Sequence, residues 1–287
     1  MSASKLLKGK PVADCLTENV IKDVEKLKNR GIVPKLAILK VGNREDDEAY
    51  QRGAINRCKK CGIDADVVEL DSNCTQEEYI VALEELNNNE SVHGILCFRP
   101  LPKHINEEVI ENLIHPEKDV DCFSPVNMAK IMFGDDTAYP PCTPMGVIEI
   151  INYYGIDIRG KNIAVLGRSL VVGKPLSILL MNRDATVTVC HSKTEDIEKI
   201  AESNDIIISC MGRAKMVNED FVNSKSIVID VGINFDEEGN MCGDADFDNI
   251  LDKVERITPV PGGVGAVTTS VLASHVVRAC KNISNLN

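Results

Sequence analysis

The stretch KNIAVLGRSLVVGKP, from Lys161 to Pro175, determines how the rest of this chain is interpreted. Its apolar run ends at Leu166, is too short for a helix and stops at Gly167, so it predicts a buried strand. The following segment, Pro175 to Arg183, has leucines and an isoleucine at helical spacing. Gly167 and Gly173 let the backbone approach a ligand, and a helix N-terminus favours a phosphate. We expect a strand, a glycine turn and a helix, the unit of a dinucleotide-binding fold.

The spacing of this turn is ambiguous by itself. GRSxxVG differs from the usual GxGxxG, and its two glycines are explained equally well by tight packing of the strand on the helix. The next expected strand, Ala185 to Cys190, is followed by His191 and Ser192, with no carboxylate to bind the ribose of NAD. Arg168 in the turn and Ser192 suit a 2′-phosphate, so we expect NADP as the cofactor.

Length, composition and charge narrow the class of protein. A chain of 287 residues is long enough for two domains, each with its own core. Hydrophobic residues make up 44% and charged residues 26%, which is typical of soluble globular proteins. The net charge of −12 argues against nucleic acid as a partner. No segment resembles a signal peptide or approaches the roughly 18 apolar residues of a membrane span, so we expect a cytoplasmic protein with no membrane association.

The eleven cysteines predict reduced thiols, because their number is odd and the chain is large enough to build its own core. Cys58 and Cys61 form a CxxC pair. A zinc site needs four ligands and no second pair at ligand spacing accompanies this one, so we predict buried thiols on a helix and no metal site.

Strands and helices alternate in the first half of the sequence. Three strands are expected there, at Lys35 to Val41, Asp64 to Leu70 and Val92 to Phe98. Helices are expected between and before them, at Pro11 to Arg30, Glu45 to Lys60 and Thr75 to Asn89. Thr75 and Glu78 have the spacing of a capping box. The alternation predicts a parallel sheet covered by helices.

The second half repeats this pattern after a series of proline-rich segments. These segments, in which we expect the chain to cross between domains, are Arg99 to Ile105, His115 to Pro125 and Tyr139 to Pro144. A helix with Pro144 at its first position is followed by strands expected at 162–167, 185–190, 205–210 and 226–231. The last helix is expected from Val267 to Cys280. The predicted fold class is α/β with two parallel-sheet domains, the second of Rossmann type.

Seven motifs in order along the chain resemble the methylenetetrahydrofolate dehydrogenase/cyclohydrolase family, the FolD-type enzymes. They are PLPKHI, PEKDVD, PCTPMG, GRSLVVGKP, ATVTVCHSKT, IDVGIN and TPVPGGVGA. The resemblance implies a folate-binding domain at 1–123, joined by a C-terminal helix at about 268–287, and an NADP domain at 124–267. A cleft separates the two domains in this family.

The resemblance also implies an activity and its residues. Members of the family oxidise 5,10-methylenetetrahydrofolate with NADP, and most hydrolyse the methenyl product to 10-formyltetrahydrofolate. The implied cofactor contacts are Gly167, Arg168, Ser169, Gly173, Ser192 and Ile233. The implied substrate contacts are Tyr50, Asp121, Pro261 and Gly262, of which we predict Tyr50 and Asp121 as catalytic. A homodimer is implied as well.

Each of these side chains also has a simpler interpretation. Tyr50 by itself is more often half-buried packing, Asp121 can cap a turn, and PVPGG can be a rigid loop. His104 and His191 are not expected to act as bases, because hydride transfer from this substrate depends on positioning.

Several family positions on the folate side are changed in this sequence. Ala54 stands where the family has a lysine, and Phe98 stands where it has the supporting glutamine. Arg99 replaces a leucine, and Cys122 replaces a glycine. Asp47 replaces a serine, and we expect its carboxylate on a solvated surface. Ala266 stands where the Pro/Gly loop normally has proline.

These changes predict a dehydrogenase with absent or weak cyclohydrolase activity, because alanine and phenylalanine cannot relay a proton. A fully bifunctional enzyme and a non-catalytic folate- or nucleotide-binding relative remain the alternatives.

Overall fold

The computed structural model describes residues 5–286, apart from the side chains of residues 45 and 46. The chain forms two compact units. The N-terminal unit comprises Asp14–Pro141 and Thr269–Asn287, and the C-terminal unit comprises Met1–Ala13 and Cys142–Thr268. Helices α1 (Gly9–Lys28) and α10 (Gly265–Ile283) each contribute residues to both units.

Two segments group differently from the expected domains of 1–123 with about 268–287 and 124–267. The N-terminal segment belongs with the C-terminal unit, where the Leu7 N–H donates to Ile257 O at 2.8 Å. Residues 124–141 belong with the N-terminal unit, where the Asn127 amide donates to the Asp119 carboxylate at 2.9 Å. The expected ranges include residues 1–4 and 287, which lie outside the described part, and they stay a prediction.

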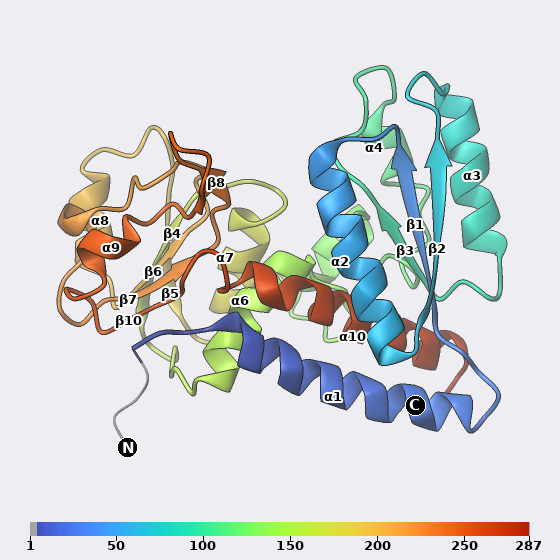
Figure 1. The fold of residues 1–287 in the computed structure, drawn as a ribbon, viewed down its shortest axis with the longest axis horizontal. Helices are drawn as coiled ribbons and strands as arrows, with labels where there is room; N and C mark the ends of the chain where they lie inside the picture. The colour runs from blue at the N-terminus through green and yellow to red at the C-terminus, as the bar shows by residue number, and fades with distance from the viewer. Residues whose placement is uncertain (1–4, 287) are drawn as a thin grey trace. The chain divides into compact units, whose positions relative to one another are not determined.

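The N-terminal unit contains a three-stranded parallel sheet in the order β2-β1-β3. Its elements are β1 (Lys35–Val41), α2 (Glu45–Cys61), β2 (Asp64–Leu70), α3 (Gln76–Asn88), β3 (Gly94–Cys97), α4 (Glu107–Ile110) and α5 (Pro125–Met132). Figure 1 shows α2 and α3 on opposite sides of this sheet. Strands β1 and β2 have the bounds that the sequence predicted, and α3 begins with the predicted capping box between Thr75 and Glu78.

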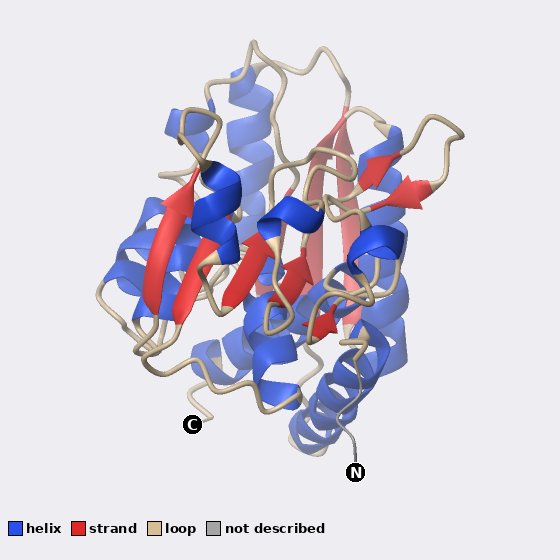
Figure 2. Ribbon diagram, turned by 90° about the vertical axis from the view of Figure 1, so that its left-hand side faces the viewer, coloured by secondary structure: helices blue, strands red, loops and turns tan. Residues whose placement is uncertain are grey.

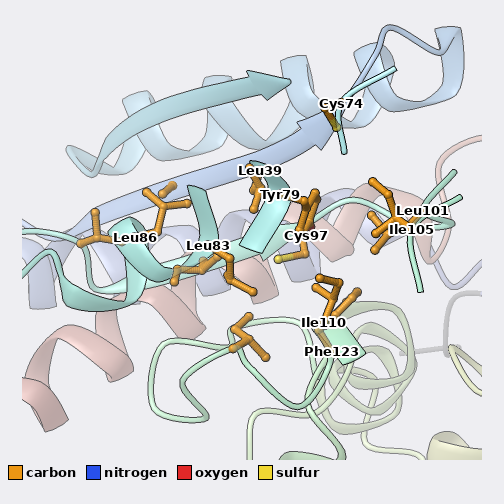
Figure 3. Close-up of a cluster of buried hydrophobic side chains, with 14 residues drawn as sticks. Leu39, Cys74, Tyr79, Leu83, Leu86, Cys97, Leu101, Ile105, Ile110 and Phe123 are labelled. Carbon is orange, nitrogen blue, oxygen red and sulfur yellow. The ribbon is translucent and has the colours of Figure 1, made fainter. Parts of the chain in front are cut away.

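One face of this sheet packs against α3 in an apolar cluster (Figure 3). Ala37 and Leu39 of β1 and Cys97 of β3 contribute from the sheet, and Tyr79 and Leu83 contribute from α3. All five are buried. Strands covered on both faces explain why β1 reads as a continuous apolar run and not as an alternating one.

The C-terminal unit contains a five-stranded parallel sheet in the order β10-β7-β6-β4-β5 (Figure 2). Its strands are β4 (Asn162–Leu166), β5 (Thr186–Cys190), β6 (Ile206–Ser209), β7 (Ile227–Asp230) and β10 (Arg256–Ile257). Its helices are α6 (Cys142–Tyr153), α7 (Gly173–Met181), α8 (Ile197–Glu202), η1 (Glu219–Phe221) and α9 (Phe247–Ile250). A two-stranded antiparallel ribbon joins β8 (Asn234–Phe235) to β9 (Met241–Cys242). Pro144 is the third residue of α6 and not the expected first, and the last helix is longer than the expected 267–280.

Cys58 and Cys61 are both buried in α2, as their helical spacing predicted. Burial raises the pKa of the Cys58 thiol to about 12. Across residues 5–286, no group of three or more His, Cys, Asp or Glu side chains has an arrangement that holds a metal ion. Within the same residues, no helix has the length and apolar character needed to cross a bilayer.

Candidate functional site

A pocket of about 420 Å³ opens at the carboxyl ends of three adjacent strands of the C-terminal unit. Its lining residues follow β4, β5 and β6 and include the beginning of α8. They are Gly167, Arg168, Ser169, His191, Ser192, Thr194, Ile197, Cys210, Met211, Arg213 and Met216.

The strand order explains why the pocket forms at this place. Strand β4 lies between β5 and β6, so the chain leaves β4 toward one side of the sheet and later returns on its other side. Loops after β4 and β6 therefore diverge, which opens a crevice at the carboxyl ends of the strands. Ligands of open parallel sheets bind in such crevices.

The two glycines of the turn are required by close packing. Gly167 has φ +130°, and a Cβ there would lie 2.5 Å from Cys210 O. A Cβ on Gly173 would lie 2.2 Å from Gly167 O. The packing interpretation of these glycines is thus correct, and the same packing places the Gly167 backbone in the wall of the pocket.

Ser169 closes the turn onto the helix that follows it. Its Oγ accepts hydrogen bonds from the N–H groups of Val172 at 3.1 Å and Gly173 at 3.4 Å. Helix α7 starts at Gly173, two residues before the predicted start at Pro175. Its N-terminus therefore lies directly after the turn that lines the pocket.

Arg168 and Ser192 are exposed and line the same pocket, from the ends of β4 and β5. The loop after β5 is held by local hydrogen bonds, since Thr194 Oγ1 accepts from the His191 N–H at 2.9 Å. The Lys193 N–H donates to His191 Nδ1 at 3.2 Å. Among the described residues that line this pocket, none is acidic. Such a lining suits an anion.

The segment after β6 is anchored by the buried carboxylate of Asp244. One oxygen accepts from the Ser209 hydroxyl at 2.8 Å and from the Met211 N–H at 2.7 Å. The other accepts from the Arg213 N–H at 2.8 Å and from the Asn234 amide at 2.9 Å. This carboxylate fixes the backbone that carries Met211 and Arg213 into the pocket lining.

A second buried carboxylate supports the first. Asp230 Oδ1 accepts from the Asp244 N–H at 3.1 Å and the Gly232 N–H at 2.9 Å, and its Oδ2 accepts from the Ala245 N–H at 2.8 Å. Burial, together with the negative charge of Asp244, raises the pKa of Asp230 to about 6.

Sequence reasoning did not single out Arg213, Met211 or Asp244. The available signal was the expected strand at 205–210, because neighbouring parallel strands end at one edge of a sheet and the residues that follow them lie close together. Nothing in the spacing indicated Asp244, whose partners are as many as 35 positions away in the sequence.

The remaining predicted residues of this unit lie in two other loops. Ile233 is 60% exposed and lies between β7 and β8. Pro261 and Gly262 are exposed in the loop between β10 and α10, where Gly262 O accepts from the Gly9 N–H at 2.8 Å. Gly262 has φ +102°, which favours glycine at that position.

In the N-terminal unit, helix α2 carries Tyr50 together with the changed positions Asp47 and Ala54. The ring of Tyr50 is half-buried, and its centroid lies 5.8 Å from that of Phe98 with 33° between the ring planes. Phe98 follows β3 and is only 6% exposed. Ala54, one helical turn after Tyr50, is completely buried. The described surroundings of Tyr50 thus include a packed phenyl ring where the family has a glutamine.

Asp47 is not on a solvated surface, so that expectation is wrong. It is 8% exposed in the first turn of α2, and the Arg44 guanidinium donates to both carboxylate oxygens, at 2.7 and 2.8 Å. Arg44 also donates to Arg99 O at 2.9 Å. Arg99 in turn pairs with Glu107 at 2.6 Å and lies 4.4 Å above the ring of Phe123.

The three charged residues Lys118, Asp119 and Asp121 of the PEKDVD segment differ in burial. Lys118 is buried and donates to the carbonyls of Asn87 and Asn89 at the C-terminal end of α3, each at 2.8 Å. Asp119 is completely buried and accepts from the Phe123 N–H at 2.8 Å. Asp121 is only partly buried.

Comparisons with known proteins identify the family of this chain. The tetrahydrofolate dehydrogenase/cyclohydrolase catalytic domain matches residues 7–121, and the NAD(P)-binding domain of the same family matches residues 141–284. The bifunctional protein FolD of Clostridioides difficile (strain 630) is 58% identical over 281 residues, which cover 98% of each chain.

Solved structures share the whole fold. The bifunctional enzyme FolD of Campylobacter jejuni is 39% identical with a TM-score of 0.94, over 96% of this chain and 98% of that one. The Trypanosoma brucei enzyme, solved in complex with NADP cofactor and an inhibitor, is 35% identical with a TM-score of 0.92, over 98% and 99%. As its motifs predicted, this chain is an enzyme of the tetrahydrofolate dehydrogenase/cyclohydrolase family, and its C-terminal half is an NAD(P)-binding domain.

Proposed function

We propose that this enzyme oxidises 5,10-methylenetetrahydrofolate to 5,10-methenyltetrahydrofolate with NADP, and that it hydrolyses the methenyl product weakly or not at all. The observation that carries the first part is the pocket of the C-terminal unit, which combines Arg168 and Ser192 with a lining free of carboxylates among the described residues. An enzyme that uses NAD usually has an acidic residue after the second strand, to bind the ribose hydroxyls.

Several residues of this unit fit the cofactor. The turn Gly167–Ser169 and the N-terminus of α7 suit its pyrophosphate, and Arg168 with Ser192 suits the 2′-phosphate. The backbone at Ile233 contributes a further contact in this proposal. When bound, the nicotinamide ring supplies a hydride acceptor.

The folate residues act by binding and orientation. Tyr50 stacks on the folate ring system, and Asp121 accepts hydrogen bonds from the pterin. Pro261 and Gly262 contact the substrate from the loop before α10. The nitrogen lone pair beside the methylene carbon expels the hydride, so no side chain has to remove a proton in this step.

Hydrolysis has the opposite requirement, because water must be activated and protons moved. Ala54 has no group for this task, and Phe98 offers only a packed ring. Three charged side chains nearby in the sequence are engaged elsewhere. Arg57 donates to Thr17 Oγ1 at 2.7 Å, and Asp47 is bound by Arg44. The Lys40 ammonium group is buried and pairs with Asn43 Oδ1 at 2.6 Å and with Glu69 Oε2 at 2.9 Å.

The dehydrogenase proposal is tested by mixing purified enzyme with methylenetetrahydrofolate and either NADP or NAD, and following methenyl absorbance. We expect formation of the methenyl product, faster with NADP. A protein that binds folate and cofactor without forming this product would be the non-catalytic relative, and the proposal would be wrong.

The hydrolysis proposal is tested by supplying methenyltetrahydrofolate and comparing its decay with and without enzyme. General acid–base catalysis is worth about 10²–10⁴-fold, so its loss should leave decay near the spontaneous rate. The double variant Ala54→Lys/Phe98→Gln should accelerate it. Because Ala54 is completely buried, retained dehydrogenase activity must show that this variant folds.

The variant Lys40→Met tests whether another lysine of the N-terminal unit has taken over the role of the missing lysine at position 54. Marked acceleration of hydrolysis by the unmodified enzyme would favour the bifunctional alternative, and its loss in Lys40→Met would identify the substitute group. The homodimer implied by the family resemblance stays a separate prediction, checked by light scattering.

A further inference from the structure

Two arginines from different strand ends line the pocket of the C-terminal unit. Arg168 follows β4 and Arg213 follows β6. Within residues 5–286 neither guanidinium has a carboxylate partner. The Arg213 guanidinium donates to the Sδ atom of Met216 at 3.8 Å, and a thioether sulfur is a weak acceptor. Two guanidinium groups are thus available to a ligand in one pocket.

The charge of the expected ligand exceeds what a single arginine neutralises. A phosphate monoester carries about −1.5 to −2 charges at neutral pH, whereas one guanidinium carries one positive charge. The protein as a whole has a net charge of −12, so a doubly charged anion needs a local excess of positive charge to bind. Arg168 and Arg213 together match that charge, and the described pocket lining adds no carboxylate to oppose it.

The backbone at Arg213 is fixed before any ligand binds. Its N–H donates to Asp244 Oδ1 at 2.8 Å, and Asp244 Oδ2 holds the two preceding N–H groups, of Met211 and Gly212. Because this carboxylate is buried and holds the main chain, the Arg213 side chain starts from a fixed point at the edge of the pocket. Pre-organisation of this kind lowers the entropic cost of binding.

We propose that Arg213 is a second specificity-determining residue for NADP, and that its guanidinium pairs with the 2′-phosphate together with Arg168. The inference rests on the proposed NADP-dependent activity. The sequence motifs assign this phosphate site to Arg168 after β4 and Ser192 after β5. The inference adds Arg213, which follows β6.

The experiment is isothermal titration of the full-length protein with NADP, NAD, adenosine 2′,5′-bisphosphate and 5′-AMP. Arg213→Gln removes the charge, and Arg213→Lys keeps it. Arg159→Gln is the matched control, since Arg159 belongs to the same unit and its exposed side chain pairs with Asp184 at 3.2 Å. Arg168→Gln reports on the phosphate site assigned in the proposed function.

A charge-assisted hydrogen bond is worth about 1.5–3 kcal/mol, so Arg213→Gln should weaken NADP and adenosine 2′,5′-bisphosphate by roughly tenfold or more. Binding of NAD and 5′-AMP should stay within about twofold of the unmodified protein, and Arg213→Lys should recover most of the loss. Arg159→Gln should change nothing.

Two failures are distinguishable. If the unmodified protein does not prefer NADP to NAD, both the proposed cofactor and this inference are overturned. If it prefers NADP and loses that preference in Arg168→Gln but not in Arg213→Gln, only this inference is overturned. Equal weakening of NADP and NAD by Arg213→Gln would also overturn it, since it would indicate damage to the loop.

Discussion

Mild acid should destabilise this protein through His275, a buried histidine of α10. His275 is 6% exposed, and its Nδ1 lies 2.9 Å from Val120 O. Its ring meets that of Tyr139 edge-on, with centroids 5.7 Å apart. Burial and the nearby Arg278 guanidinium lower the pKa of His275 to about 3. The imidazole is therefore neutral in the folded protein down to strongly acidic pH, with Nδ1–H donating to Val120 O.

The magnitude follows from linkage between protonation and folding. The unfolded chain binds this proton with an ordinary pKa of about 6.5, while the folded state does not bind it until near pH 3. Stability is complete above about pH 6.5 and is lost as the pH falls toward 3. At about pH 5.5 the unfolded histidine is protonated roughly ten to one, which corresponds to a loss of about 1.4 kcal/mol relative to pH 7.5.

The assay is urea unfolding followed by circular dichroism at both pH values. Burial also lowers the pKa of His93, whose Nδ1 accepts from the Lys35 N–H at 3.1 Å, so both histidines contribute with the same sign. His275→Gln should reduce the difference between the two pH values, and His275→Gln/His93→Gln should reduce it further. His115→Gln, at an exposed position, is the control.

A direct check is titration of the His275 ring by NMR. Titration near its ordinary value of about 6.5, or an unchanged pH difference in His275→Gln, would refute the reasoning.

Four further predictions concern the site. Arg168→Ala should weaken NADP binding by roughly ten- to a hundredfold and NAD binding much less. Equal losses for both cofactors would show that Arg168 does not bind the 2′-phosphate. Asp121→Asn and Tyr50→Ala should each raise KM for folate while leaving NADP affinity unchanged, and normal folate kinetics in both would exclude their role. Gly173→Ala places a Cβ 2.2 Å from Gly167 O and should destabilise the protein by about 1–3 kcal/mol in urea unfolding; an unchanged midpoint would contradict the close packing. Asp244→Asn should cost about 1–3 kcal/mol for each N–H left unpaired, and an unaltered free energy of unfolding would show that the loop does not depend on this carboxylate.

Strands and helices were predictable because their cause is local. Buried parallel strands such as β1 and β4 appear in the sequence as apolar runs. The capping box at Thr75 marks the N-terminus of α3. The short strand β10 was missed, since two residues carry no period. The start of α7 was placed two residues late because Gly173 suggests a turn more than a helix.

The site was predictable only where a motif marked it. Arg168 and Ser192 follow strands that the sequence predicts. The main chain at Arg213 is instead positioned by the hydrogen bond from its N–H to Asp244, 31 positions away. The position of Asp47 was mistaken for the same reason. Its acidic neighbours suggested solvent, and the ion pair with Arg44 that buries it appears only in the folded chain.

Two of the changed positions of the N-terminal unit, Asp47 and Arg99, belong to one network of hydrogen bonds and ion pairs. Asp47 binds the Arg44 guanidinium through both oxygens, and Arg44 reaches the carbonyl of Arg99. Arg99, adjacent to Phe98, is then fixed by Glu107 and by the ring of Phe123.

Each member of this network is bonded to another, so reverting one of them leaves a charge without its partner, at a cost that rises with burial. The Phe98 ring in turn packs on that of Tyr50, and Ala54, one turn further along the same helix, is completely buried. A lysine at position 54 alone would meet this packed apolar surface without the glutamine amide that supports it in the family. We therefore expect Ala54→Lys alone to leave hydrolysis near the spontaneous rate, with gain only when Phe98→Gln accompanies it. A single variant that hydrolyses as fast as the double one would show that the network does not constrain the position.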